Sequence, residues 1–235
     1  MLRVVALGVL VVALAGCGGD DEALPTEPVQ ARAYFLLDDR VWPVARAIAE
    51  EGDAADEIVA ALVQGPTTDE IDVGLTSSFP EGVDVDVADG VATVESETEL
   101  TTEQLAQLVY SLTQLDPVVQ SVDVDGRAYT RADFEEQTPS VLVESPLAFE
   151  EVASSITATG TANTFEATFH YEVVDAEGEV VDENFVTATS GSGTRGTFEF
   201  TTGDVDDIAA LVVFERSAED GSRIHEVEIP LTPAP

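Results

Sequence analysis

The chain has 235 residues, of which 47 are Asp or Glu, 9 are Arg and none is Lys, so its formal net charge at pH 7 is −38. This charge argues against a nucleic-acid partner, because affinity for nucleic acid comes from phosphates neutralised by Lys and Arg. Hydrophobic residues make up 44% of the chain, which supports folded cores and excludes wholesale disorder. A single Cys excludes a structural disulfide.

The first residues of the chain have the features of an export signal. One basic residue, Arg3, precedes an apolar run from Val4 to Leu14, and no acidic residue occurs before Asp20. A positive region followed by a short apolar region is typical of a secretory signal. The run is shorter than the roughly 20 apolar residues that a membrane span needs.

Leu14, Ala15, Gly16 and Cys17 close this run and together resemble the lipobox of bacterial lipoproteins. The resemblance implies that residues 1–16 are a signal peptide and that Cys17 carries a diacylglycerol on the outer face of the cytoplasmic membrane. The acyl chains must hold the protein there, because without Arg3 the chain has 47 acidic residues against 8 Arg, a net charge near −39 that repels anionic lipid. A plain secretion signal and an N-terminal anchor helix are the alternatives.

Residues 17–31 are rich in acids, Gly and Pro, which predicts a tether. Two strands follow, at Ala33–Leu37 and Val41–Ala47, joined by a turn at Asp38-Asp39. Pro43 places the second strand at an edge of its sheet, because Pro lacks the backbone N–H of a ladder.

Two amphipathic helices come next. Asp53 stands at the N-cap of the first, which Gly65-Pro66 ends. Thr101 and Gln104 form a capping box for the second, which Asp116-Pro117 ends. Apolar residues recur at helical spacing in both, namely Ile58, Val59, Leu62 and Val63, then Leu105, Leu108, Val109 and Leu112.

Short strands accompany these helices. Val83 to Val87 alternates Val with Asp, and Asp89-Gly90 joins this strand to Val91–Val94 in a predicted hairpin. Ser121–Val124 is a further short strand. Residues 32–135 are therefore predicted to form a strand-rich α+β domain with two helices on one face of its sheet.

After a polar stretch from Thr130 to Ser140, the pattern changes to strands alone. Alternation in Phe165–Val173 places Phe165 and Phe169 on one face of a strand. Seven short strands at this spacing predict a β-sandwich over residues 140–232. The predicted strands are Val141–Val143, Ser155–Ala162, Phe165–Val173, Val180–Thr189, Thr197–Thr202, Ala209–Arg216 and Ile224–Ile229.

The segments YFLLDD, VWPVAR, ALVQGPT, GLTSSFP, DGVATV, QLVYSLTQL and VDVDG occur in this order within residues 33 to about 129. This order resembles the sporulation and spore-germination domain called GerMN, most specifically at Gly65-Pro66-Thr67 and Gly74-Leu75. Glu95-Ser96-Glu97 departs from the Asp-Leu-Ser of relatives, which puts any site at that turn in doubt. Residues 141–231, with VESP, GTRGTFEF and VVFERSAEDGSRIHEVEIPL, resemble the immunoglobulin-like domain that often accompanies GerMN.

Motifs for catalysis are weak. Gly191–Gly196 spells G-x-G-x-x-G, but dinucleotide binding needs that loop to open a helix, and the following residues alternate as a strand. We expect a hairpin loop there. Carboxylate pairs for glycoside hydrolysis remain open among the 47 acidic residues, since spacing does not say which of them meet.

Metal sites are also weakly indicated. Ser121 to Gly126 matches the first half of an EF-hand loop, but Ala132 stands where a bidentate Glu belongs. Solvated turns are expected, with a weak surface ion site as the alternative. His170 and His225 have no partner at zinc-ligand spacing. We therefore predict no catalytic residue, no metal and no cofactor.

Trp42 and Arg46 are candidates for an interface, because Trp and Arg are enriched at binding hot spots. Alternatively, Trp42 packs under its own hairpin and Arg46 pairs with a nearby acid. The three resemblances, to a lipobox, to GerMN and to the immunoglobulin-like domain, imply a membrane-anchored, non-catalytic envelope lipoprotein that contacts itself or an envelope protein. The alternatives are a solute-binding lipoprotein that serves a transporter and, third, an envelope hydrolase.

Overall fold

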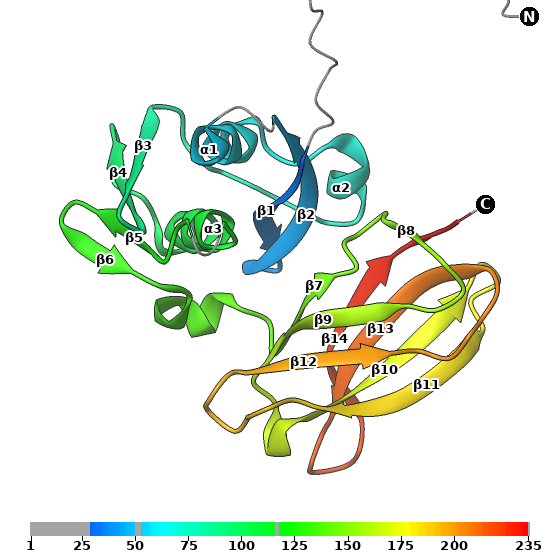
Figure 1. Ribbon diagram of the computed structural model, residues 1–235. Coiled ribbons are helices and arrows are strands. Elements are labelled where there is room, and N and C mark those ends of the chain that lie inside the picture. Colours follow the sequence, from blue (N-terminus) through cyan, green and yellow to red (C-terminus); the bar gives the residue numbers. More distant parts are fainter. Residues whose placement is uncertain (1–28, 50–52, 116–117, 235) are drawn as a thin grey trace, which may run out of the picture.

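The computed structural model of the protein describes residues 29–49, 53–115 and 118–234. They form an α+β domain and a β-sandwich side by side (Figure 1), which confirms the predicted fold class. The first domain contains β1 (Val29–Leu37), β2 (Arg40–Ile48), α1 (Ala54–Gln64), α2 (Thr68–Asp72), β3 (Val83–Ala88), β4 (Val91–Ser96), α3 (Thr102–Thr113), β5 (Ser121–Val124), β6 (Arg127–Tyr129) and the 3-10 helix η1 (Arg131–Gln137). The sandwich contains β7 (Val141–Ser145), β8 (Glu151–Val152), β9 (Thr157–Ala162), the 3-10 helix η2 (Phe165–Ala167), β10 (Thr168–Asp175), β11 (Val180–Thr187), β12 (Gly196–Thr201), β13 (Ile208–Arg216), β14 (Arg223–Pro230) and β15 (Thr232–Pro233).

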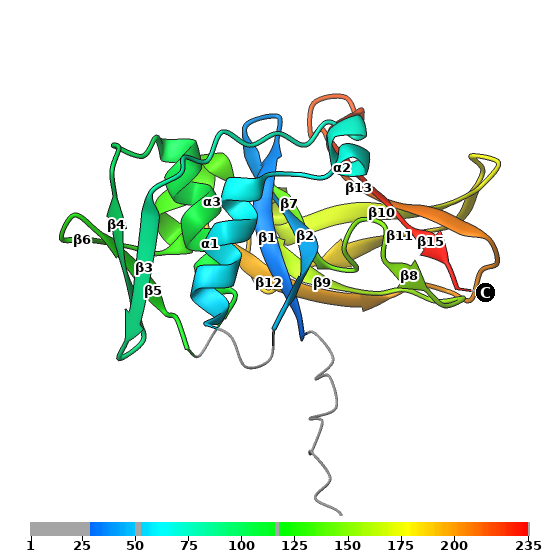
Figure 2. The same cartoon turned by 90° about the horizontal axis from the view of Figure 1, so that it is seen from above.

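In the first domain, helices α1 and α3 lie between two sheets rather than on one face of a single sheet (Figure 2). One sheet is the antiparallel hairpin β1-β2, and the other has the order β3-β4-β5-β6 with β4 and β5 parallel. The prediction of a single sheet is wrong because α3 is buried on nearly every side. Such a helix needs a layer on both faces.

The β1-β2 hairpin forms as its sequence dictates. Asp38 and Asp39 have φ angles of 49° and 62°, as a two-residue hairpin turn requires. Pro43 lies opposite Tyr34, whose backbone N–H donates to Ser111 of α3 rather than to β2. The missing N–H of proline therefore costs the hairpin no hydrogen bond.

Three of the four predicted helix ends are confirmed. The Asp53 side chain accepts from the Ala55 N–H at 3.1 Å, and Gly65, with a φ of 81°, caps the other end of α1. Thr101 and Gln104 form both bonds of a capping box at α3. The predicted stop at Asp116-Pro117 falls outside the described residues.

The second domain is a sandwich of a four-stranded sheet, β11-β10-β13-β14, and a three-stranded sheet, β12-β9-β7. These are the seven predicted strands. Aromatic residues fill the space between the sheets: the Phe169 and Phe198 rings meet edge to face with centroids 4.8 Å apart, and Tyr171 stacks on Phe200 at 4.5 Å. At Gly160, an added Cβ would lie 2.0 Å from the Leu142 carbonyl oxygen, so this close approach of β9 to β7 requires glycine.

One local prediction in the sandwich is wrong. Phe165 lies in η2 rather than in a strand, because Glu166 and Ala167 adopt left-handed φ angles of 53° and 56° that turn the chain. The Phe165 side chain is consequently 63% exposed. The loop Gly191–Gly196 joins β11 of one sheet to β12 of the other, and the Thr189 N–H donates to the Thr197 carbonyl at 2.9 Å across its base, as in a hairpin.

Candidate functional site

The two domains meet at an interface that includes a charged network. Arg131 of η1 donates to the Glu144 carboxylate of β7 at 2.8 Å, and the Tyr34 hydroxyl of β1 donates to the same carboxylate oxygen. Arg131 also donates to Thr113 Oγ1 at 2.9 Å and to the Tyr110 carbonyl at 3.2 Å. Its guanidinium lies 4.7 Å from the centre of the Tyr110 ring, a cation–π contact. One arginine thus ties three elements of the first domain to the sandwich.

The protonation states of this network are fixed by its surroundings. Burial, reinforced by the Glu144 carboxylate, raises the pKa of Tyr34 far above its usual value, so its hydroxyl remains a donor. Burial opposes the charge on Arg131, but Tyr34 and Glu144 outweigh this and raise the pKa of the guanidinium. The Tyr34 phenol therefore stays neutral and the Arg131 guanidinium stays charged across the physiological pH range.

A second ion pair lies at the same interface. Arg195, in the loop between β11 and β12, makes two hydrogen bonds of 3.0 and 2.8 Å to Glu135 of η1 and donates to the Pro139 carbonyl at 2.9 Å. Asn163 donates to the same carboxylate at 2.8 Å. Burial favours protonation of Glu135, but the bonds from Arg195 and Asn163 prevail and lower its pKa. We call the five residues of the two ion-pair networks the interdomain clamp: Tyr34, Arg131, Glu135, Glu144 and Arg195.

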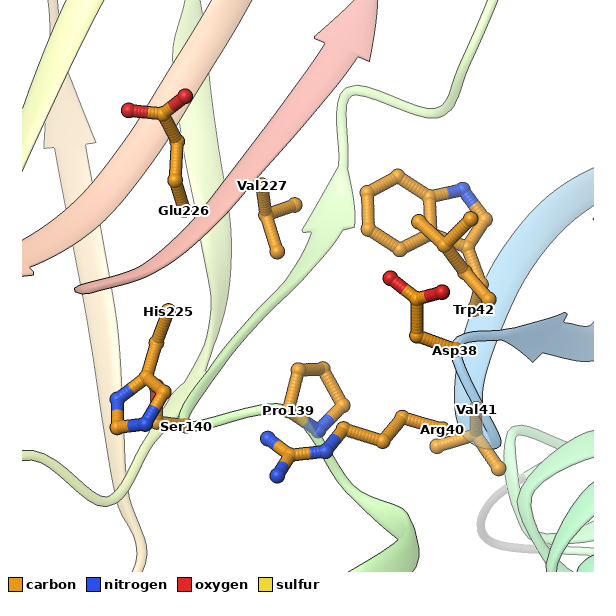
Figure 3. Close-up of a pocket in the computed structure, with 10 residues that line it drawn as sticks. Asp38, Arg40, Val41, Trp42, Pro139, Ser140, His225, Glu226 and Val227 are labelled. Carbon is orange, nitrogen blue, oxygen red and sulfur yellow. The ribbon is translucent and has the colours of Figure 1, made fainter. Parts of the chain in front are cut away.

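A cleft of about 270 Å³ opens elsewhere between the domains (Figure 3). The tip of the β1-β2 hairpin and the first residues of β2 form one wall, which includes Arg40 and Trp42. Ser140, from the segment that joins the domains, and His225 of β14 belong to the opposite wall. We call this space the interdomain cleft.

His225 is held at the cleft by an irregularity of its strand. The register of β13 and β14 shifts so that His225 and Glu226 together lie opposite Phe214, which is a β-bulge. His225 has a left-handed φ of 52°, and its Nδ1 lies 2.8 Å from Glu215 Oε1. Bulges commonly redirect a side chain next to a functional site. Here the bulge and Glu215 together fix the imidazole at the cleft.

Strand β11, at the edge of the four-stranded sheet, carries exposed apolar residues. The exposed fractions are 48% for Val180, 40% for Val181 and 62% for Phe185. Phe185 lies opposite His170, which in turn lies opposite Phe214, so the three rings form one row across the sheet. Burial and then the nearby Arg216 lower the pKa of His170, which keeps this row largely uncharged at neutral pH.

The candidate interface residues Trp42 and Arg46 lie apart. Trp42 is 7% exposed and borders the interdomain cleft. Arg46 makes two hydrogen bonds of 2.7 Å to the Glu70 carboxylate of α2, and its guanidinium lies 5.0 Å from the centre of the Phe35 ring. The lipobox residues Leu14, Ala15, Gly16 and Cys17 lie outside the described residues.

The weak metal motifs have ordinary structural surroundings. The EF-hand-like stretch forms β5 and the turn that follows it, where Asp123 accepts from the Gly126 N–H at 2.9 Å. Within residues 29–49, 53–115 and 118–234, no three His, Cys, Asp or Glu side chains converge as a metal site would need. In these same ranges, no helix has the length and apolar character that crossing a membrane requires.

Sequence reasoning missed Arg40, Arg131 and Arg195, together with the Glu144 carboxylate. The rarity of arginine is a usable signal, because a chain with 9 Arg and 47 acidic residues has few cations for many carboxylates. Each Arg that is at least partly buried is then a candidate for an ion pair or a ligand contact.

Two family models match the chain. Residues 32–130 match the model described as sporulation and spore germination, and residues 140–222 match the model described as an immunoglobulin-like domain of bacterial spore germination. These matches confirm the resemblance of both segments and their order. No curated protein and no solved structure matches the chain.

Proposed function

We propose that the chain acts as a lipid-anchored, non-catalytic protein-interaction module. It carries a sporulation and spore germination domain followed by an immunoglobulin-like spore germination domain, which makes it a protein related to these processes. The anchor in this proposal is Cys17 within its lipobox-like motif. The residues between Cys17 and β1, which begins at Val29, serve as the tether, so that both domains stand on the outer side of the membrane.

The observation that carries the interaction role is the edge strand β11, which exposes three large apolar side chains. An edge strand presents unpaired backbone N–H and C=O groups, and soluble proteins usually protect such edges with charges, prolines or covering segments. In β11 the exposed side chains include Val180, Val181 and Phe185, and the acidic residues Asp182 and Glu183 lie between them. An apolar edge of this kind fits a partner that adds a strand or packs an apolar surface on it.

The charge of the chain indicates the kind of partner. At −38, two copies of the chain repel one another at low ionic strength, so self-association through β11 is disfavoured. A second envelope protein with a neutral or basic contact surface meets no such repulsion. We therefore assign β11 to a different envelope protein.

Photo-crosslinking in intact cells tests this role. The photoreactive residue p-benzoylphenylalanine replaces Phe185 in one strain and Ile71 of α2, which is 55% exposed in the other domain, in a matched control strain. We expect one or two defined envelope proteins to be captured from position 185 and not from position 71. Capture from position 71 alone would move the contact to the first domain, and capture of a second copy alone would replace the partner by self-association.

The anchor needs a separate test. In the Cys17→Ser variant we expect the protein to leave the membrane fraction, and mass spectrometry of the wild-type N-terminus should show the acyl chains. A Cys17→Ser protein that stays in the membrane fraction would contradict lipid anchoring. The crosslinking pattern of this variant then shows whether partner capture depends on the anchor.

Solute binding is the second candidate function, and the interdomain cleft is the observation that favours it. Ligand pockets occur preferentially between domains. A metabolite that raises the melting temperature of the protein in a concentration-dependent way supports this role. If no metabolite in the screen raises the melting temperature, the result argues against solute binding.

A further inference from the structure

Arg40 has hydrogen-bonding capacity that the fold does not use. Its side chain is partly buried at the cleft, yet it makes no hydrogen bond or ion pair with any residue in the described part of the chain. A guanidinium has five N–H donors and stays charged at any physiological pH. By contrast, Arg46, Arg131, Arg195 and Arg223 all pair with carboxylates.

Two further polar groups lie on the facing side of the same cleft. The Ser140 hydroxyl is buried and has no hydrogen-bond partner in the described part of the chain. Ser140 itself is one of the residues that line the cleft. His225 uses Nδ1 for Glu215, and its Nε2 makes no hydrogen bond within the described ranges. Figure 3 shows the Arg40 side chain extending toward the side of the cleft where His225 and Ser140 lie.

The other residues that line the cleft, and its volume, limit the polarity, charge and size of a ligand. Trp42 and Val227 add apolar surface. Asp38 and Glu226 also border the cleft, but in Figure 3 their carboxylates point away from the Arg40 guanidinium. These two acids disfavour an occupant with more than one negative charge. A volume of about 270 Å³ is below that of pockets for drug-sized ligands.

From these contacts we propose that the interdomain cleft binds a small monocarboxylate with an apolar portion. Arg40 pairs with the carboxylate, His225 and Ser140 add hydrogen bonds to it, and Trp42 packs on the apolar portion. This inference rests on the second candidate function and specifies its ligand chemistry. It is independent of the partner assigned to β11.

Fluorescence provides a direct test, because Trp42 is the only Trp in the chain and borders the cleft. The full chain is titrated at constant ionic strength with hexanoate, with its uncharged analogue hexanamide and with inorganic phosphate. We expect a saturable change in Trp42 emission with hexanoate and a much weaker response to the other two. No saturable response to hexanoate overturns the proposal, and an equal response to hexanamide or phosphate overturns the assignment to a monocarboxylate.

Variants locate the binding site. Arg40→Gln should weaken hexanoate binding about tenfold or more, because it removes a charge-assisted contact. Arg32→Gln is the matched control, since Arg32 lies on the same hairpin, is partly buried and does not border the cleft. Ser140→Ala should weaken binding several-fold while leaving the melting temperature unchanged. Equal binding by the wild type and Arg40→Gln would overturn the proposal.

The metabolite screen separates this inference from the function on which it rests. A neutral or cationic metabolite that raises the melting temperature and alters Trp42 emission would preserve solute binding and overturn the monocarboxylate. Failure of hexanoate together with failure of the whole screen would overturn both.

Discussion

The interdomain clamp and the interdomain cleft lie at one interface and differ in how their polar groups are satisfied. In the clamp, Arg131 and Arg195 each pair with a carboxylate and make further hydrogen bonds. At the cleft, Arg40 and the Ser140 hydroxyl have no hydrogen-bond partner among the described residues. Unpaired polar groups cost stability when they are removed from water. We infer that the clamp serves to hold the domains and that the cleft retains its open groups for binding.

The largest expected effect is at the centre of the clamp. Glu144→Ala leaves Arg131 without its carboxylate and the Tyr34 hydroxyl without its acceptor, which should lower the free energy of unfolding by about 3 kcal/mol. Urea denaturation followed by Trp42 emission measures it. Glu151→Ala, at an exposed position of the sandwich, is the control and should change the free energy by less than about 0.5 kcal/mol. A loss below about 1 kcal/mol for Glu144→Ala would mean that the clamp does not hold the domains.

A smaller loss is expected at the second ion pair. Arg195→Ala removes two bonds to Glu135 and one to the Pro139 carbonyl, and we expect a loss of about 1 kcal/mol. The Glu135 side chain is 42% exposed, so water replaces part of what is lost. The same denaturation experiment measures the change. A loss as large as that of Glu144→Ala would contradict the expectation that the Arg131–Glu144 pair contributes more to stability than the Arg195–Glu135 pair.

The contribution of Arg195 should depend on pH. Its hydrogen bonds, with that of Asn163, lower the pKa of Glu135 below its ordinary value of 4.5, against the opposing effect of burial. A carboxyl whose pKa is lowered in the folded state stabilises the fold above the pKa of the unfolded state, and this contribution is lost as pH falls through the folded value. The free-energy difference between wild type and Arg195→Ala should therefore stay constant from pH 7 to 5 and shrink below 4.5.

The matched control for this pH series is Arg127→Ala. Arg127 lies over the Tyr129 ring and makes no ion pair within the described residues, so its difference from the wild type should not change with pH. A difference for Arg195→Ala that grows on acidification would contradict the assignment of the lowered pKa to this ion pair.

The smallest stability effects are expected at the cleft. Ser140→Ala and Arg40→Gln remove groups without hydrogen-bond partners among the described residues, so each should change the free energy of unfolding by less than about 0.5 kcal/mol. Urea denaturation without added ligand checks this. A loss of 1 kcal/mol or more in either variant would show that the cleft is a structural contact like the clamp and would end the contrast between the two.

Much of the fold was predictable because its determinants are local. The Asp53 cap, the Thr101-Gln104 capping box and the Asp89-Gly90 turn act within a few residues of chain, and all three are present. Strand alternation identified all seven strands of the two main sandwich sheets. The start of β10 was misplaced because left-handed φ angles at non-glycine residues, as at Glu166, leave no mark on an apolar-polar pattern.

The interface was not predictable in the same way. Tyr34 meets Glu144 across more than a hundred residues of chain, and Arg195 meets Glu135 across 60. Periodicity and spacing do not carry information on such pairs. The position of Trp42 beside the cleft likewise depends on how β14 approaches the β1-β2 hairpin, which no local signal of either segment encodes.

The bond between Tyr34 and Glu144 also determines how the molecule carries mechanical load. Tyr34 is on β1, the first described strand, and Glu144 is on β7 of the sandwich. Tension applied to the chain ahead of Val29 enters β1 and passes through this contact directly into the sandwich. Helix α1 and the sheet β3-β4-β5-β6 lie beside this path (Figure 2), so a pull between the proposed tether and the proposed partner on β11 would reach the sandwich without having to pass through them.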